Sequence, residues 1–236
     1  METTDFNLVE PRLTRKVRAH WLTQKPDSNS FLVAGTSLLS LLIASLLYWR
    51  DDFHLAGLMT AIPQNVFEKH EYWRLWTSLL AHEDMAHLLS NSLLFSVFSY
   101  FLFGYFGGFV FPVATFLFGG IVNYIVLITM PANSELLGVS GVVYWMGSVW
   151  LTLYFLIETR EKISRRLIKT IGIAAVLFIP ETYHRNVSYL SHFVGFALGM
   201  VFALLYFRQN RLRFQRAEFI EWVNNDGDVI PPEPRY

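Results

Sequence analysis

Long apolar segments constrain the fold of this chain more than any other feature. Six can be drawn, and they contain no Asp, Glu, Arg or Lys apart from Lys169 at the edge of the fifth. Most of them approach the roughly 20 residues that a helix needs to cross a bilayer. Because backbone polar groups in lipid must be satisfied within their own segment, each is expected to be helical. The sequence therefore predicts an all-α, polytopic membrane protein, a bundle of six transmembrane helices. The six segments are residues 30–49, 85–106, 108–130, 138–157, 167–179 and 189–207.

The basic residues indicate how these helices are oriented. Lys and Arg gather before the first segment, between the fourth and the fifth, and after the sixth, while the opposite connections hold few. Six crossings place these three regions on one face, and an excess of Lys and Arg marks the cytoplasmic face. We therefore expect both termini in the cytoplasm. The chain then divides into a cytoplasmic N-terminal tail (1–29), a membrane domain (30–207) and a cytoplasmic C-terminal tail (208–236).

Composition excludes some functions, and the tails carry weaker signals. The chain has no cysteine, which excludes disulfides, thiol nucleophiles and cysteine-based metal sites. No basic patch with interleaved aromatic residues indicates nucleic acid. Leu13, Val17 and Trp21 are four residues apart, which favours a short interfacial helix, and residues 209–223 are expected to form another. Residues 224–236 are expected to be disordered.

The fourth segment opens with a serine between two glycines, in the sequence Gly138-Val139-Ser140-Gly141. One interpretation is close helix packing, for which small residues are common in membrane bundles. The other is a nucleophile: the glycines let a substrate backbone approach, and free N–H groups at a helix N-terminus can hold an oxyanion. Tyr144 follows one turn later on the same face.

Two polar side chains share one face where the second segment begins. His87 and Asn91 are four residues apart, and because both are costly in lipid they should face the bundle interior. An interhelical hydrogen bond without function, a metal site and a proton path are alternatives. His82, His87 and His192 could in principle bind zinc, but the first two are five apart rather than the four of a helical zinc pair. We expect no metal.

The sixth segment places a histidine on a stripe of glycines. His192, Gly195 and Gly199 lie on one narrow face, and the last two have the spacing of closely approaching membrane helices. A histidine on such a stripe can reach far into the neighbouring helix. If that neighbour presents Ser140 and Tyr144, the serine and the imidazole meet near the outer end of both helices.

Two further regions have unusual composition. The connection over residues 50–84 is long and includes Tyr72, Trp73 and Trp76, which indicates either a piece lying in the membrane interface or a simple aromatic belt. The fifth segment is short, ends at Pro180 and is followed by a polar stretch over 181–188. It is the natural candidate for a mobile gate.

These motifs resemble those of the rhomboid family of intramembrane serine proteases, in its minimal six-helix bacterial type. The resemblance covers about residues 72–199 and rests on four motifs in the family's order. They are Trp73-Arg74 in the first loop, His82-x4-His87-x3-Asn91 entering the second helix, Gly138-Val139-Ser140-Gly141 with Tyr144 on the fourth, and His192-x2-Gly195-x3-Gly199 on the sixth.

The resemblance implies a role for each motif residue. Ser140 is the nucleophile and His192 the general base, His87 and Asn91 donate to the oxyanion beside the Ser140 amide, and Tyr144 packs on the imidazole. We assign Gly138 to the oxyanion group as well. The residues expected to give structural support are Gly141, Gly195, Gly199, His82, Trp73 and Arg74. The implied substrates are transmembrane proteins in the bilayer of a bacterial inner membrane, with no cofactor.

The residues alone point to a dyad rather than a triad. The predicted spans hold no carboxylate, so a Ser-His-Asp triad is excluded unless Glu83, Asp84 or Glu135 folds back. Two alternatives belong to other functional classes. One is a catalytically inactive rhomboid-like factor that binds membrane proteins. The other is a small transporter with a histidine proton relay, which would need charged or discontinuous spans.

Overall fold

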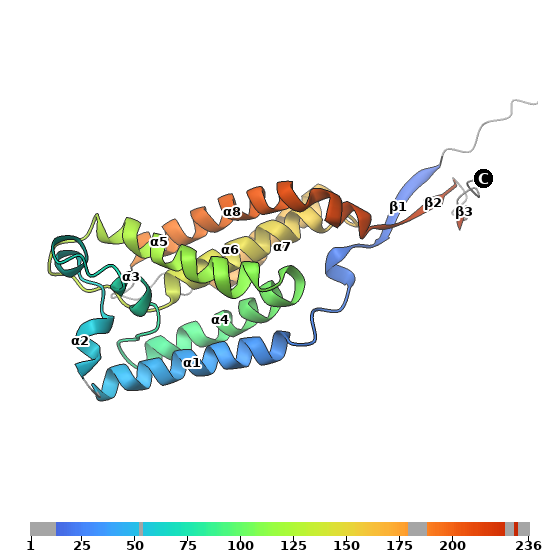
Figure 1. The fold of residues 1–236 in the computed structure, drawn as a ribbon. Coiled ribbons are helices and arrows are strands. Elements are labelled where there is room, and N and C mark those ends of the chain that lie inside the picture. Colours follow the sequence, from blue (N-terminus) through green and yellow to red (C-terminus); the bar gives the residue numbers. More distant parts are fainter. Residues whose placement is uncertain (1–12, 52–53, 179–187, 225–228, 231–236) are drawn as a thin grey trace, which may run out of the picture.

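The computed structural model describes residues 13–51, 54–178, 188–224 and 229–230. Its long helices lie side by side in one bundle (Figure 1). Five are long and apolar enough to cross a membrane, which confirms the prediction of a helical, polytopic membrane protein. They are α1 (Ser30–Arg50), α4 (Met85–Phe106), the span Phe109–Leu127 made of η4 (Phe109–Ala114) and α5 (Thr115–Leu127), α6 (Ser140–Ile157) and α8 (Tyr189–Arg216).

The third predicted segment is kinked near its start. Phe111 has φ −131° and ψ 124°, which interrupts the helical backbone within η4. Pro112 follows it, and a proline disfavours the helical conformation in the residue before it. The prediction of one continuous helix over 108–130 was therefore wrong at its beginning, although the proline was visible in the sequence.

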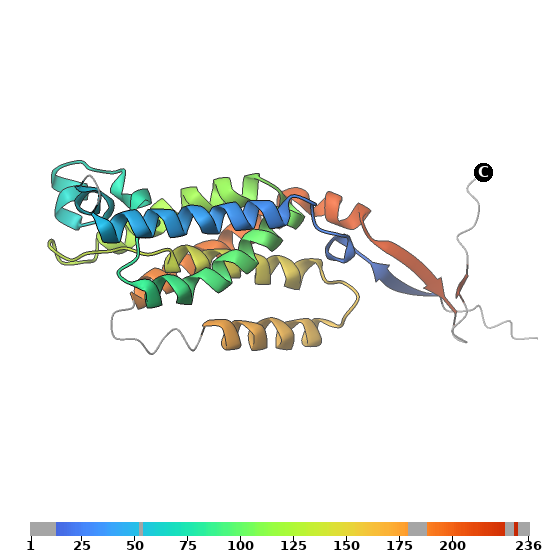
Figure 2. The ribbon, with the colours of Figure 1, turned by 90° about the horizontal axis from the view of Figure 1, so that it is seen from below.

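The predicted fifth span corresponds to α7 (Ile163–Phe178), which is not among the five candidate spans. It has 16 residues and begins earlier than expected, so that Arg165, Arg166 and Lys169 lie within it. Figure 2 shows α7 running along the outside of the bundle, where it packs against α6. The polar stretch after α7 lies outside the described residues up to 187, so the gate stays a prediction.

The centre of the bundle is α6. Its side chains pack against α4, α5 and α8, and Trp145, Met146 and Val149 are fully buried. On the α8 side the backbones themselves meet: a Cβ added to Gly195 would lie 2.1 Å from the Gly141 carbonyl oxygen. A Cβ added to Gly199 would lie 2.5 Å from the Trp145 carbonyl oxygen. Only glycine fits at these two positions of α8.

The connection between α1 and α4 folds into short helices held by one buried arginine. These are α2 (Ala56–Met59), η3 (Gln64–Glu68) and α3 (Arg74–Thr77). Arg74 donates to the Gly57 carbonyl at 2.6 Å, the Thr60 carbonyl at 2.9 Å and the Glu71 carboxylate at 2.5 Å. Trp73, by contrast, is half exposed. Arg74 therefore stabilises this connection, and neither residue lines the cavity described below.

The two tails pair with each other as strands, so the expectation of a short interfacial helix around Leu13, Val17 and Trp21 was wrong. The expectation for residues 209–223 was wrong at its end: residues up to Arg216 are helical as the continuation of α8, and Phe219–Val223 form a strand. The strand β1 (Thr14–Ala19) is antiparallel to β2 (Phe219–Val223), which also pairs with β3 (Val229–Ile230). Residues four apart share a face in a strand as well as in a helix, so the spacing of Leu13, Val17 and Trp21 was ambiguous. We call this end of the bundle, where both tails lie, the tail end (Figure 1).

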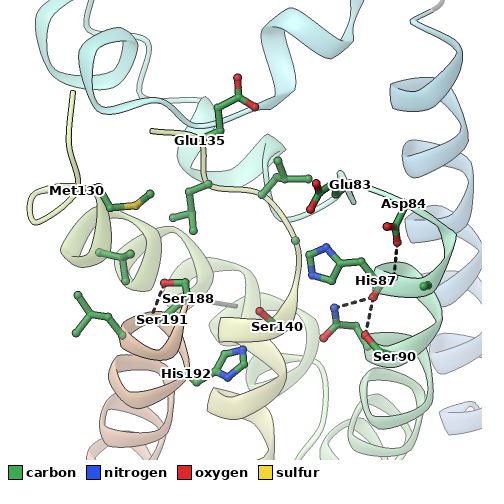
Figure 3. A pocket seen from close by; sticks show the side chains of 17 residues that line it. Glu83, Asp84, His87, Ser90, Met130, Glu135, Ser140, Ser188, Ser191 and His192 are labelled. Atoms are coloured by element: carbon green, nitrogen blue, oxygen red, sulfur yellow. Dashed lines mark hydrogen bonds between the residues drawn. The ribbon is translucent and has the colours of Figure 1, made fainter. Parts of the chain in front are cut away.

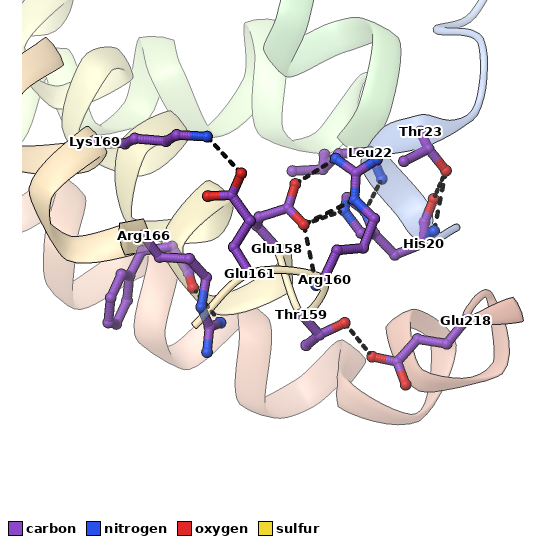
Figure 4. Close-up of polar contacts among 11 residues, drawn as sticks. His20, Leu22, Thr23, Glu158, Thr159, Arg160, Glu161, Arg166, Lys169 and Glu218 are labelled. Atoms are coloured by element: carbon purple, nitrogen blue, oxygen red, sulfur yellow. Dashed lines mark hydrogen bonds and ion pairs between the residues drawn. The ribbon is translucent and has the colours of Figure 1, made fainter. Parts of the chain in front are cut away.

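A short 3-10 turn, η1 (Trp21–Thr23), follows β1, and the residue before it anchors the N-terminal tail to the end of α6 (Figure 4). His20 is buried, and its Nε2 lies 3.0 Å from a carboxylate oxygen of Glu158, the residue after α6. Arg160 donates to both oxygens of the same carboxylate, at 2.9 and 2.6 Å. Burial alone would raise the pKa of Glu158, but Arg160 and His20 outweigh it and lower that pKa from 4.5 to about 2.

We expect Glu158→Gln to lower the free energy of unfolding by about 2 kcal/mol at neutral pH, since hydrogen bonds to charged groups contribute that much. Because the folded pKa is depressed, the contribution of Glu158 is present above about pH 4.5 and is lost as the pH falls toward about 2. Unfolding in detergent, at neutral pH and at a pH near 2, measures the loss of stability and its dependence on pH. Glu161→Gln, which removes an exposed pair with Lys169, is the control. A Glu158 effect that does not change with pH would contradict the ionised contact.

Candidate active site

A cavity of about 890 Å³ (Figure 3) lies at the end of the bundle opposite the tail end (Figure 1). It is bounded by the first turns of α4, α6 and α8 and by the loops that precede α4 and α6. The lining includes Ser140, His192, His87, Asn91 and Gly138. Three helices that are far apart in the sequence thus bring these residues to one cavity.

The loop before α6 presents Ser140 as the first residue of that helix. Gly138 has a φ of +106°, a conformation that favours glycine, and its N–H donates to the Ser78 carbonyl at 2.9 Å. A Cβ added to Gly138 would lie 2.7 Å from Cε1 of His87. Glycine therefore allows both the turn and the close approach of the His87 ring. The first N–H groups of a helix lack intrahelical acceptors, so those at the start of α6 are available as donors.

His82 holds the same loop from behind. Its Nε2 accepts the Val139 N–H at 3.4 Å, and its Nδ1 lies 3.0 Å from the Ser45 hydroxyl on α1. Since Nε2 is an acceptor, the proton of the neutral ring is assigned to Nδ1, which donates to Ser45. Burial, and next the charge of His87, lowers the pKa of His82 from 6.5 to about 3. The ring therefore stays neutral at physiological pH and fixes the backbone next to Ser140.

His192 lies on α8 with its ring stacked on Tyr144. The two ring centroids are 3.9 Å apart and the planes differ by 14°. The Tyr144 hydroxyl donates to the Phe178 carbonyl at 2.9 Å, which anchors the stack to α7. His192 is only 4% exposed, and among the described residues neither of its ring nitrogens has a hydrogen-bond partner. Ser140 and His192 thus share a cavity without a hydrogen bond between them, as is common in a substrate-free site.

His87 and Asn91 line the cavity from α4. The His87 N–H donates to the Asp84 carboxylate at 2.8 Å, which caps the helix, and the Asn91 amide donates to the His87 carbonyl at 3.0 Å. An asparagine amide has two N–H donors, so one remains for a ligand. The His82 ring is 5.1 Å from the His87 ring, and both His82 nitrogens are used within the fold. In the described part of the chain no three His, Asp or Glu side chains are grouped as metal ligands.

The comparison with protein families identifies the architecture. The sequence model of the Rhomboid domain matches residues 69–209, which is more than half of the chain and includes all four motifs. This protein belongs to the rhomboid family. No curated protein matches this rhomboid sequence.

Three residues of this rhomboid site were not predicted. Ser45 bonds His82 from α1, Ser78 accepts from Gly138, and Asp84 caps α4. Signals existed for two of them: an Asp directly before an apolar segment is a preferred N-cap, and a serine inside a membrane helix should face a polar partner. The Ser78 carbonyl carried no signal, because a backbone acceptor is identified only by the fold around it.

Proposed function

We propose that this rhomboid-family protein is a serine endopeptidase that cleaves transmembrane segments, with Ser140 as nucleophile and His192 as general base. One observation carries the proposal: a nearly fully buried imidazole, whose two nitrogens have no partner among the described residues, lies in the same cavity as Ser140. Buried polar groups normally have partners, and the exceptions are often functional. The Ser140 hydroxyl, once a bound substrate positions it, is the partner that this cavity offers to the His192 ring.

In the first step, the Ser140 hydroxyl attacks the carbonyl carbon of the scissile bond while His192 accepts its proton. The new C–O bond converts the carbonyl oxygen to an oxyanion. His87, the free Asn91 donor and N–H groups at the start of α6 stabilise this charge, since they line the cavity around Ser140. The Gly138 turn makes room for the His87 ring.

In the second step, the oxyanion collapses, the C–N bond breaks and the imidazolium gives its proton to the leaving amine. Water then attacks the acyl-enzyme, again with His192 as base, and releases Ser140. The open cavity gives this water access from the surface. No described carboxylate bonds His192, and the stacking on Tyr144 orients the ring in place of an aspartate.

Fluorophosphonate labelling tests the proposal against an inactive rhomboid-like binding factor. A proteolytic site should react covalently at Ser140, and Ser140→Ala should abolish the labelling. A binding factor keeps the fold and remains unlabelled.

We expect His87→Ala and Asn91→Ala each to lower kcat by about 10² with a smaller change in KM, because several donors share the oxyanion and only the transition state carries the charge. Steady-state cleavage of a model transmembrane substrate measures this. Ser92→Ala is the matched control: Ser92 lies on the same helix, and its hydroxyl donates to the local Leu88 carbonyl. If both variants matched Ser92→Ala, α4 would contribute packing alone.

Cleavage is expected at the depth of the first turn of α6, near the cavity end of the bundle. A regular substrate helix must unwind there before its carbonyl can be attacked. The helices α6 and α8 pack closely next to Ser140, since a Cβ on Gly141 would already lie 2.3 Å from the Ser191 hydroxyl. The family resemblance also implies a small residue before the scissile bond. We therefore expect a small residue before the scissile bond, and at least about tenfold slower cleavage when Phe replaces it. Mass spectrometry of the products maps the site, and a cut near the tail end would contradict this geometry.

A further inference from the structure

Acidic side chains occupy the entrance of the cavity. Glu83 and Asp84 come from the loop before α4, and Glu135 comes from the loop before α6. All three are exposed, and Figure 3 shows them above Ser140 and His192. Among the described residues, no Lys or Arg lines this cavity, and none of the three carboxylates forms an ion pair. The described lining of the entrance therefore carries a net negative charge.

The fold anchors the backbone beside two of these carboxylates, which form no ion pair among the described residues. Next to Glu135, Leu136 exchanges two backbone hydrogen bonds with Ala61, at 2.9 and 3.1 Å. Next to Glu83, the His82 carbonyl accepts the Trp49 indole N–H at 2.7 Å. Asp84 differs, because its carboxylate caps α4. Glu83 and Glu135 are thus placed on anchored backbone, and neither carboxylate is neutralised by a Lys or Arg of the described chain.

A second, independent observation indicates that a ligand enters here. At the inner part of the same cavity, the His192 side chain is only 4% exposed, and both of its ring nitrogens lack partners among the described residues. A ligand that extends from this imidazole to the surface along the Glu83 and Glu135 side passes these carboxylates. Its part at the entrance should therefore carry the opposite charge.

We propose that the preferred substrates of this protein carry a Lys or Arg a few residues from the scissile bond, on the side toward the cavity entrance, where Glu83 and Glu135 bind it. This inference rests on the proposed function and names the substrate class for that site. An extended segment covers about 3.4 Å per residue, so a few residues lead from the reacting carbonyl to the entrance. The long Lys or Arg side chain supplies the remaining reach.

The expected preference is moderate and depends on salt. An exposed ion pair contributes up to about fivefold in affinity, and a concave site of one sign strengthens the field. We therefore expect about threefold weaker binding for each carboxylate removed. A Lys substrate should bind about tenfold more tightly than its Glu counterpart. Because exposed charges are screened within about 10 Å at 0.1 M salt, the preference should shrink at high ionic strength.

Binding of labelled membrane-spanning peptides to the Ser140→Ala protein in phosphatidylcholine nanodiscs tests the proposal. The peptides differ only in Lys, Gln or Glu at the entrance-side position, and the neutral lipid adds no charge preference. The protein variants are Glu83→Gln, Glu135→Gln and a charge-reversed double variant that combines Glu83→Lys with Glu135→Lys. Glu68→Gln is the matched control, because Glu68 is an exposed carboxylate that does not line the cavity.

Support consists of tighter binding in the order Lys, Gln, Glu, a loss of preference in the Gln variants and an inverted order after charge reversal. Equal binding of the three peptides, or the same loss in Glu68→Gln, overturns the proposal. If a variant fails to fold, binding of the three peptides to the protein with Glu83 and Glu135 intact, measured over a range of salt concentrations, still tests the proposal. Because the readout is binding, failure of the proteolytic function is distinguishable: peptides would then bind while the protein with Ser140 intact leaves them uncut.

Discussion

Ser140→Ala and His192→Ala are each expected to lower cleavage of a transmembrane substrate by at least about 10³, while folding and membrane insertion stay intact. Residues of a nucleophile–base pair act as a unit, so the loss of either removes nearly the whole advantage of covalent catalysis. The fold should tolerate both changes. Among the described residues His192 forms no hydrogen bond that its replacement would break, and a smaller side chain at Ser140 leaves the Gly138 turn unchanged.

The control for this prediction is Ser90→Ala. Ser90 lines the same cavity, and its hydroxyl donates to the local His87 carbonyl at 2.9 Å. Its replacement should change cleavage by less than about threefold, because a local side-chain bond on a helix contributes little. Substantial activity in Ser140→Ala, with correct folding, would rule out the dyad and leave this rhomboid as a binding factor.

Gly195→Val is expected to destabilise the protein by about 3 kcal/mol and to abolish cleavage. A Cβ at this position would lie 2.1 Å from the Gly141 carbonyl oxygen and 3.4 Å from the Trp145 amide nitrogen. Both neighbours are backbone, so neither can rotate away, and α6 and α8 must separate. Overpacking of a core costs about 1–3 kcal/mol, and a backbone clash belongs at the upper end. The same separation moves His192 away from Ser140.

Gly172→Val on α7 provides the matched control, because nothing lies within 4 Å of a Cβ added there. Unfolding in detergent and cleavage of the model substrate are measured for both variants. Gly195→Ala should show an intermediate loss, since it adds the Cβ alone. Equal stability and activity of Gly195→Val and Gly172→Val would show that the two helices do not pack through this glycine.

Most of the fold was predictable because lipid permits few alternatives. The predicted segment 85–106 matches α4, and 30–49 and 138–157 differ from α1 and α6 by one or two residues at an end. In a bilayer, a charge-free apolar segment must form its own hydrogen bonds, so its boundaries follow from its polar flanks. The tails lack this constraint. Their backbone groups form hydrogen bonds between β1 and β2, which are far apart in the sequence, and a local sequence pattern does not reveal such a pairing.

The sequence by itself determined which side chains lie on the same face of one helix. The spacing of His87 and Asn91, of Ser140 and Tyr144, and of His192 with its glycines follows from the period of the helix, which is local. Only the tertiary structure decided which faces meet. The stack of His192 on Tyr144, the bond from Val139 to His82 and the gathering of Glu83 and Glu135 at one entrance join separate elements. Such contacts depend on how helices cross and how loops fold, and no spacing along one segment encodes these relations.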